Sequence, residues 1–136
     1  MGEHDQNRKK LTPRKQRELD ISIEFLEGVV RRDPVYTDAI KLLADDYTQR
    51  GKFTAGLELD ERLAQLQPND PLVQYNLACS YSLTGHLPEA AAAVEKALEL
   101  GYREFTWLDT DPDLKALRAD PSFQKIRAKI KDIQPS

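Results

Sequence analysis

The sequence of 136 residues is poor in the residue types that most often carry catalysis or covalent cross-links. It contains one cysteine, one tryptophan, one methionine and two histidines. A single cysteine, Cys79, excludes a disulfide framework within the chain and is typical of a protein from a reducing compartment. We therefore expect a cytoplasmic location.

Long apolar runs are also missing. No run approaches the roughly 18 residues that a bilayer-spanning helix requires. The polar N-terminus has no apolar stretch like that of a secretory signal, and Gln6 stands where a myristoylation signal has Ser or Thr. We expect no association with a membrane.

The few candidates for chemistry do not form a recognisable site. His4, His86 and Cys79 lack the spacing of metal ligands. Cys79 and His86 lie about two helical turns apart, which is too far for a nucleophile and its base to touch. No glycine-rich phosphate loop is present. We therefore expect a protein that is not an enzyme and has no cofactor.

A group of aspartates near the C-terminus suggests calcium at first sight. Asp109, Asp111 and Asp113 alternate as in a calcium-binding loop, but the glycine and the distal glutamate of such a loop are missing. Pro112 instead fits the first residue of a helix that Asp111 caps. We favour a helix start and expect no metal.

Charge is balanced overall but uneven along the chain. The net charge of -3 and the pI near 5.4 argue against general binding of nucleic acid. A basic block near the N-terminus consists of Arg8, Lys9, Lys10, Arg14, Lys15 and Arg17. We interpret residues 1–11 as a disordered basic tail that leads into a helix. The alternative is a docking segment for nucleic acid or acidic lipid at residues 8–17.

Proline and glycine mark the ends of five helices. Thr12-Pro13 is a helix start and Asp33-Pro34 a stop, which predicts a helix over 13–32 with apolar residues at helical spacing. Further helices are expected at 37–50, from 54 to the stop at 68, from 71 to 85, and at 88–100. Asp111-Pro112 and Asp120-Pro121 predict two short helices, at about 112–118 and 121–132.

Two of these helix pairs repeat with a period of 34 residues. The matched positions include Leu43 and Leu77, Ala44 and Ala78, Tyr47 and Tyr81, and Gly51 and Gly85. Such a helix–turn–helix period resembles the tetratricopeptide repeat. Asp60 and Tyr102 depart from that pattern: the first is expected to weaken packing, and the second to end the regular array.

The resemblance implies an all-α fold, a short right-handed superhelix of antiparallel helix pairs with helical caps. Residues 12–34 are expected to form a capping half repeat, 37–70 and 71–104 two repeats, and 105–133 a C-terminal cap. The arrangement DPDL-x-x-LR-x-DP-x-F in that cap, after ALELGY, resembles the closing segment of many bacterial tetratricopeptide proteins.

In tetratricopeptide proteins, the face that packing leaves free lines a concave groove that holds a peptide or helix of a partner. Here this face is expected to carry Asp38, Lys41, Leu42, Asp45, Gln49, Leu72, Tyr75, Asn76, Cys79 and Leu83. The implied function is a non-catalytic interaction module or adaptor. The alternative is a homo-oligomeric scaffold whose stack is completed by a second chain. Some family members bind the acidic tails of chaperones through Lys, Asn and Arg side chains in this groove. Asn76 matches one such Asn, but Leu42 stands at the equivalent position of the first repeat and Asp38 has the wrong charge, so we disfavour this function.

Overall fold

The computed structural model describes residues 10–134, so most of the predicted basic tail lies outside the described part of the chain. The described residues are helical and fold without a strand. The main helices are α2 (Pro13–Arg32), α3 (Thr37–Arg50), α4 (Phe53–Leu66), α5 (Pro71–Leu83) and α6 (Leu87–Glu99). The C-terminal part forms α7 (Phe105–Thr110), the short 3-10 helix η1 (Pro112–Leu114), α8 (Lys115–Arg118) and α9 (Phe123–Ile133). The all-α prediction is confirmed.

Helix starts follow the local chemistry read from the sequence. The Thr12 hydroxyl accepts a hydrogen bond from the Lys15 backbone N–H at 3.1 Å, directly before Pro13. The Asp70 carboxylate accepts from the backbone N–H groups of Leu72 and Val73 at the start of α5. Each cap satisfies N–H groups that have no partner within the helix.

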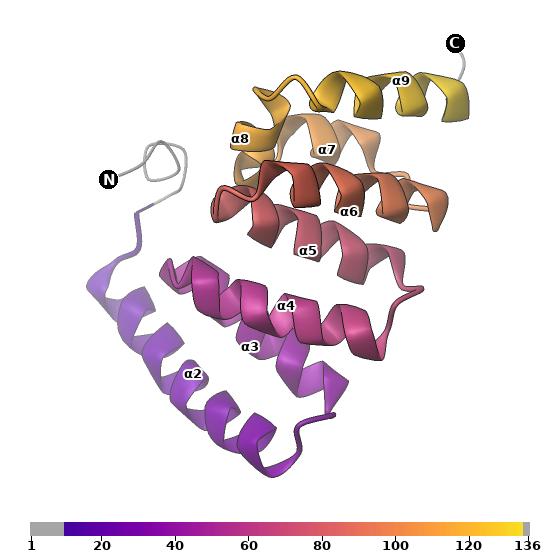
Figure 1. Ribbon diagram of the computed structural model, residues 1–136. Coiled ribbons are helices and arrows are strands. Elements are labelled where there is room, and N and C mark those ends of the chain that lie inside the picture. The colour runs from indigo at the N-terminus through magenta and orange to yellow at the C-terminus, as the bar shows by residue number, and fades with distance from the viewer. Residues whose placement is uncertain (1–9, 135–136) are drawn as a thin grey trace.

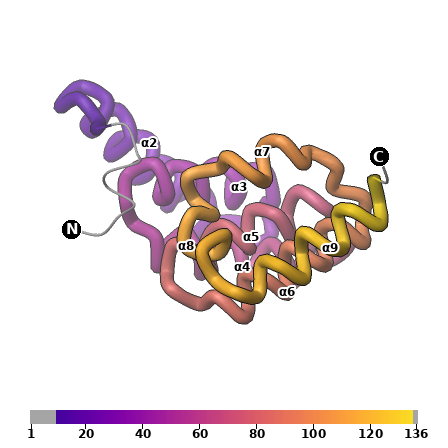
Figure 2. Tube along the Cα trace, turned by 90° about the horizontal axis from the view of Figure 1, so that it is seen from above, coloured from indigo at the N-terminus to yellow at the C-terminus, as the bar shows by residue number. Residues whose placement is uncertain are grey.

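Successive helices stack from α2 at one end to α9 at the other (Figure 1). Seen from above, α3 and α7 lie on the side opposite α6 and α9 (Figure 2). One core cluster joins α2, α3 and α4, and a larger one joins α5, α6 and the C-terminal helices. The chain is thus a layered stack of helix pairs, in which each pair buries its apolar faces against its neighbours.

The same hydrogen bond connects successive layers. The Tyr47 hydroxyl on α3 donates to the Glu27 carboxylate on α2 at 2.5 Å. The Tyr81 hydroxyl on α5 donates to the Glu61 carboxylate on α4 at 3.1 Å. Both members are shifted by 34 residues, so α2 stands to α3 as α4 stands to α5.

Small residues and glycines allow close approach and tight turns where the repeat predicts them. A side chain at Gly56 would bring its Cβ within 3.0 Å of the Thr48 hydroxyl oxygen, so α4 could not lie this close to α3. Gly51 and Gly85 adopt φ values of 86° and 81° after α3 and α5, a left-handed conformation that favours glycine.

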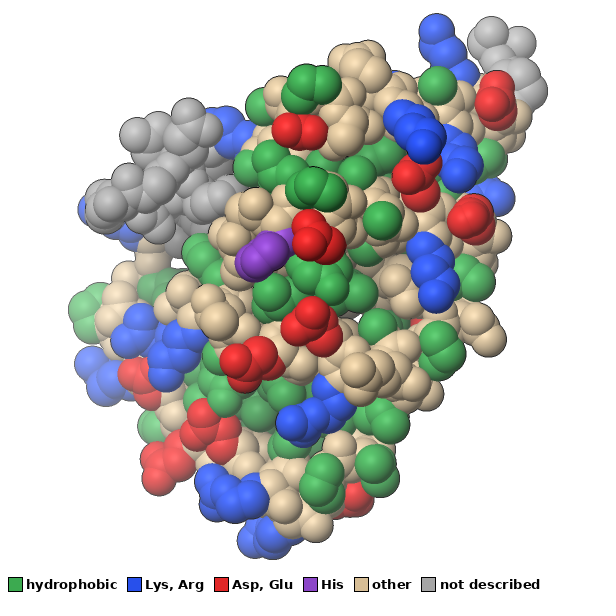
Figure 3. Space-filling model, in the orientation of Figure 1, with side chains coloured by type: hydrophobic (Ala, Val, Ile, Leu, Met, Phe, Trp, Pro, Cys, Tyr) green, Lys and Arg blue, Asp and Glu red, His purple; other side chains and the backbone are tan. Residues whose placement is uncertain are grey.

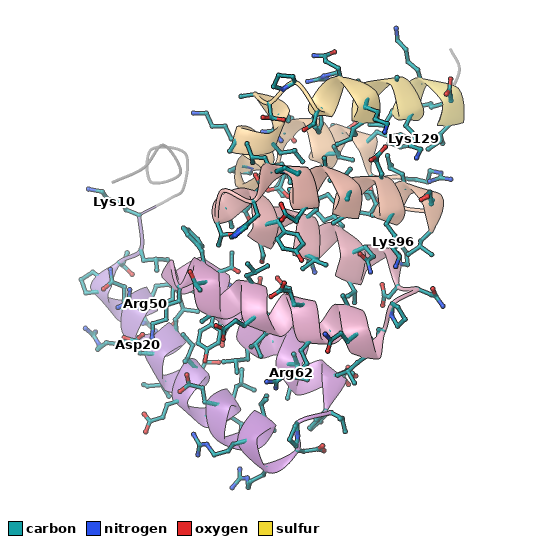
Figure 4. All side chains as sticks on the ribbon, in the orientation of Figure 1. Lys10, Asp20, Arg50, Arg62, Lys96 and Lys129 are labelled. Carbon is teal, nitrogen blue, oxygen red and sulfur yellow. The ribbon has the colours of Figure 1, made fainter. Side chains whose placement is uncertain are left out.

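The C-terminal segment folds back over α5 and α6. Leu108, Leu114 and Leu117 are fully buried, and the Leu117 backbone N–H donates to the Ser82 hydroxyl on α5 at 3.3 Å. The sequence predicted the helical segment at 112–118 but missed α7, because the six residues of α7 are too few to show a period. Glu95 on α6 pairs with Lys129 on α9 at 3.7 Å, and Figure 4 shows Lys129 there.

The face that carries α4, α6 and α9 shows no concentration of one charge (Figure 3). Lysines and arginines alternate with acidic side chains over the face that contains α4, α6 and α9 (Figure 3). At the N-terminal end, Arg50 on α3 pairs with Asp20 on α2 at 2.8 Å (Figure 4). Among residues 10–134, no helix has both the length and the apolarity that crossing a bilayer demands.

Candidate functional site

A groove lies between α3 and α5, and residues of α7 and η1 line one side of it. Its volume is about 360 Å³, within the range of small-ligand and side-chain pockets. The groove lining is formed by Lys41, Ala44, Asp45, Thr48, Asp60, Leu63, Asp70, Leu72, Val73, Tyr75, Asn76, Cys79, Ser80, Trp107, Asp111 and Asp113.

Tyr75 and Asp111 form one part of the groove floor. The Tyr75 hydroxyl donates to the Asp111 carboxylate at 2.5 Å, and its ring stacks on Tyr102 with centroids 4.3 Å apart. The Cys79 thiol lies 3.6 Å from the same carboxylate. Burial, with help from the Asp111 carboxylate, raises the pKa of both the Tyr75 hydroxyl and the Cys79 thiol. Both groups therefore stay protonated and act as donors.

Asp60 and Ser80 form a second part of the floor. The Ser80 hydroxyl donates to the Asp60 carboxylate at 2.5 Å, and only 6% of Asp60 is exposed. Burial raises the pKa of Asp60 to about 6, the Ser80 hydrogen bond lowers it, and the nearby Asp45 raises it further. Asp60 thus places an ionisable side chain at a buried position of α4. That it weakens the packing of the repeat stays a prediction.

Both apolar and polar side chains lie at or next to the groove edge. Leu72 is 57% exposed and Trp107 is 50% exposed. Lys41 lies 4.0 Å from Asp70, which is itself fixed by capping α5. The Gln49 amide donates to Asp45 at 2.7 Å.

The structure brings six of the ten residues predicted for the groove into its lining: Lys41, Asp45, Leu72, Tyr75, Asn76 and Cys79. The other four lie outside the lining: Asp38, Leu42, Gln49 and Leu83. Asp38 and Leu42 are exposed on α3, and Gln49 reaches the groove only through its hydrogen bond to Asp45.

The expectation that the inner face of α5 is open is wrong at three positions. Tyr75, Cys79 and Leu83 are 3%, 7% and 8% exposed. The physical reason is the C-terminal segment, which covers α5 and provides Tyr102 and Asp111 as partners for Tyr75. Tyr75 therefore shapes the floor of the groove and does not project from it.

The lining residues that sequence reasoning missed include Asp60, Trp107 and Asp111. Asp60 carried a signal, because it departs from the repeat pattern at a position that faces the core. Asp111 was recognised as a helix cap, and its Oδ1 does accept from the Asp113 backbone N–H at 2.9 Å. Asp111 also accepts the hydrogen bond from Tyr75. Because these two residues are 36 positions apart, no local sequence pattern could predict this contact.

The residues considered above for catalysis or metal binding do not come together in one site. Cys79 is buried, whereas His86 lies exposed in the turn before α6. Asp109 pairs with Arg127 at 3.2 Å, so Asp109 and Asp111 have different partners. Within residues 10–134, no group of three or more histidine, cysteine or acidic side chains is placed to hold a metal ion.

Comparison with known proteins gives distant relatives. No protein-family model matches the chain. Over 83 residues, 59% of this chain and 25% of the relative, the sequence is 31% identical to a chloroplastic protein of Arabidopsis thaliana. Over 103 residues, 76% of this chain, it is 27% identical to the human PEX5-related protein and 26% identical to the mouse one, covering 15% and 16% of them.

The chain spans a quarter or less of the length of the curated relatives it matches. These similarities and the stack of helix pairs together fit a tetratricopeptide-like protein.

Proposed function

We propose that this protein is a non-catalytic interaction module, an adaptor that binds a peptide or helix of a partner protein in the groove between α3 and α5. The observation that carries the proposal is the groove itself: it is lined by side chains from successive helix pairs and has Leu72 and Trp107 exposed at its edge. Exposed apolar side chains next to a preformed groove are typical of binding surfaces. The tetratricopeptide-like architecture supports the proposal, because such repeats bind partners on this face.

The test is capture of a partner by wild-type protein and by groove variants that leave the core intact. Leu72→Ser and Asn76→Ala change exposed side chains of α5. Tyr75→Ala is unsuitable, because it would remove a buried ring and leave Asp111 without its hydroxyl donor. Leu66→Ser, at an exposed leucine of α4 outside the groove, is the matched control.

We expect the two groove variants to lose the partner captured by the wild type, with unchanged circular dichroism, while the Leu66 variant retains it. Full retention by both groove variants would reject the groove as the binding surface.

A second candidate function is self-assembly, which is favoured by exposed apolar side chains on α2. Ile21 and Phe25, one helical turn apart, are 69% and 67% exposed. Such an apolar pair on a terminal helix is suited to packing against another chain. Light scattering over a range of concentrations tests this candidate: we expect an increase in mass that Phe25→Ser abolishes. A mass that stays that of the monomer at all concentrations would rule out self-assembly.

The proposed location is the cytoplasm, on the ground that the single cysteine cannot form a disulfide within the chain. Fractionation of cells that express the tagged protein checks this location. The name of one relative places that protein in the chloroplast.

A further inference from the structure

The groove between α3 and α5 is strongly unbalanced in charge. Five aspartates line it, Asp45, Asp60, Asp70, Asp111 and Asp113, against one lysine, Lys41. Lys41 is placed beside Asp70, at the end of the groove where α5 begins. The lining is therefore richer in acidic than in basic side chains, whereas both kinds are interspersed over the face that carries α4, α6 and α9 (Figure 3).

Two of these carboxylates lie at the bottom of the groove without a cation. Asp60 and Asp111 are 6% and 4% exposed, and each accepts a hydrogen bond from a hydroxyl, Ser80 for Asp60 and Tyr75 for Asp111. None of the ion pairs formed between described residues includes Asp45, Asp60 or Asp111. A buried carboxylate without a cation loses its hydration, and hydrogen bonds from neutral donors supply no opposite charge.

The cost is visible at Asp60. Burial raises its pKa to about 6, so the carboxylate is held in an environment that disfavours its charge. A neutral residue at this position would avoid the cost of burying a charge. Charged groups that reduce stability in this way are concentrated at functional sites.

We propose that the groove is specific for a cationic partner segment, an extended peptide whose lysine or arginine enters between α3 and α5 and places its charge beside Asp45, Asp60 and Asp111. This inference rests on the proposed function, since it specifies the partner of the same groove. The long aliphatic stem of lysine or arginine suits an apolar contact with Leu72, and its cation supplies a charge opposite to that of the carboxylates.

The edge of the groove fits the residues that flank such a cation. Leu72 and Trp107 expose about half of their surface on two different elements, α5 and α7. They are suited to an apolar neighbour of the lysine or arginine, and the Trp107 ring can also attract a cation over its face. The expected motif is therefore one basic residue next to an apolar one.

The experiment selects peptides from a phage library of random heptapeptides on the immobilised full-length protein, followed by titration of the selected peptides. Trp107 is the sole tryptophan, so its fluorescence reports binding at the groove edge directly. Each selected peptide is compared with versions in which its basic residue is replaced by norleucine, which keeps the stem, or by glutamate.

The protein variants separate charge from shape. Asp60→Asn retains an oxygen that can accept from Ser80, and Asp45→Asn alters an exposed side chain that cannot disturb the core. Glu58→Gln is the matched control, because Glu58 is exposed on the same helix as Asp60 and lies outside the groove lining. Circular dichroism confirms that each variant is folded.

We expect lysine- or arginine-containing peptides to be enriched, and their affinity to fall about tenfold with norleucine, with Asp60→Asn or with Asp45→Asn. The Glu58 variant should bind within about twofold of the wild type. Enriched peptides that lack a basic residue, or that bind the two aspartate variants as well as the wild type, would overturn the inference and leave the proposed function standing. If no peptide is enriched and Leu72→Ser leaves capture of a cellular partner intact, the proposed function fails, and the inference fails with it.

Discussion

At the scale of single residues, Asp60 links stability to pH. The carboxylate lies between α4 and α5 with Ser80 as its donor, and its pKa rises from 3.8 to about 6 in the folded chain. The folded protein therefore holds this proton more tightly than the unfolded chain. The contribution of Asp60 to the free energy of unfolding falls as pH rises from about 4 to about 6 and stays low above that range.

Replacing Asp60 by asparagine removes this pH dependence. We expect Asp60→Asn to raise the free energy of unfolding at pH 7 by about 2 kcal/mol, because the charge is no longer buried. The gain should shrink below pH 6 and vanish near pH 4. Urea denaturation of both proteins at several pH values measures the difference. A variant less stable than the wild type at pH 7 would show that the carboxylate is stabilised in the fold.

Tyr75 contributes at the same scale through its hydroxyl. We expect Tyr75→Phe to lower the free energy of unfolding by about 2 kcal/mol, because it leaves the buried Asp111 carboxylate without its hydroxyl donor. Tyr36→Phe, at an exposed tyrosine before α3, should change stability by less than about 0.5 kcal/mol. Chemical denaturation compares the two variants, and equal effects would contradict the assigned role of the Tyr75–Asp111 bond.

At the scale of elements, the C-terminal segment is an integral part of the stack. Leu114 in η1 is fully buried against α5, whereas Leu42 on α3 is 59% exposed. We expect Leu114→Ala to cost about 3 kcal/mol through the cavity it leaves, and Leu42→Ala to cost less than about 0.5 kcal/mol. Thermal and urea unfolding of the Leu114→Ala and Leu42→Ala variants measure the two losses of stability. A small effect at Leu114 would mean that the segment is only loosely held.

At the scale of the whole molecule, the two core clusters predict unequal stability. The cluster around α5 and α6 is larger and covered by the C-terminal helices, whereas α2 has its outer face uncovered at Ile21 and Phe25. We expect amide hydrogens of α6 to exchange at least about tenfold more slowly than those of α2, because terminal elements of a stack open more easily. Hydrogen exchange with mass spectrometry measures both helices together. Equal protection would indicate a single cooperative unit.

Local chemistry determined the secondary structure. The cap-and-proline signals at Thr12-Pro13 and Asp70-Pro71 act within one helical turn, so helix starts were readable without any tertiary information. The period of 34 residues placed Tyr47 and Tyr81 in equivalent positions, and both form the same bond to a glutamate of the preceding helix. The all-α stack followed from these short-range features.

Only the tertiary structure decided what the groove contains. The sequence by itself placed Leu72 and Asn76 on its edge, because helical spacing fixes the direction in which a side chain points. It could not show that the C-terminal segment returns over α5 and buries Tyr75 against Tyr102 and Asp111. It also could not show that Asp60 joins them in the lining. Residues that are 20 or more positions apart meet there through packing of whole helices, and that packing leaves no local pattern in the chain.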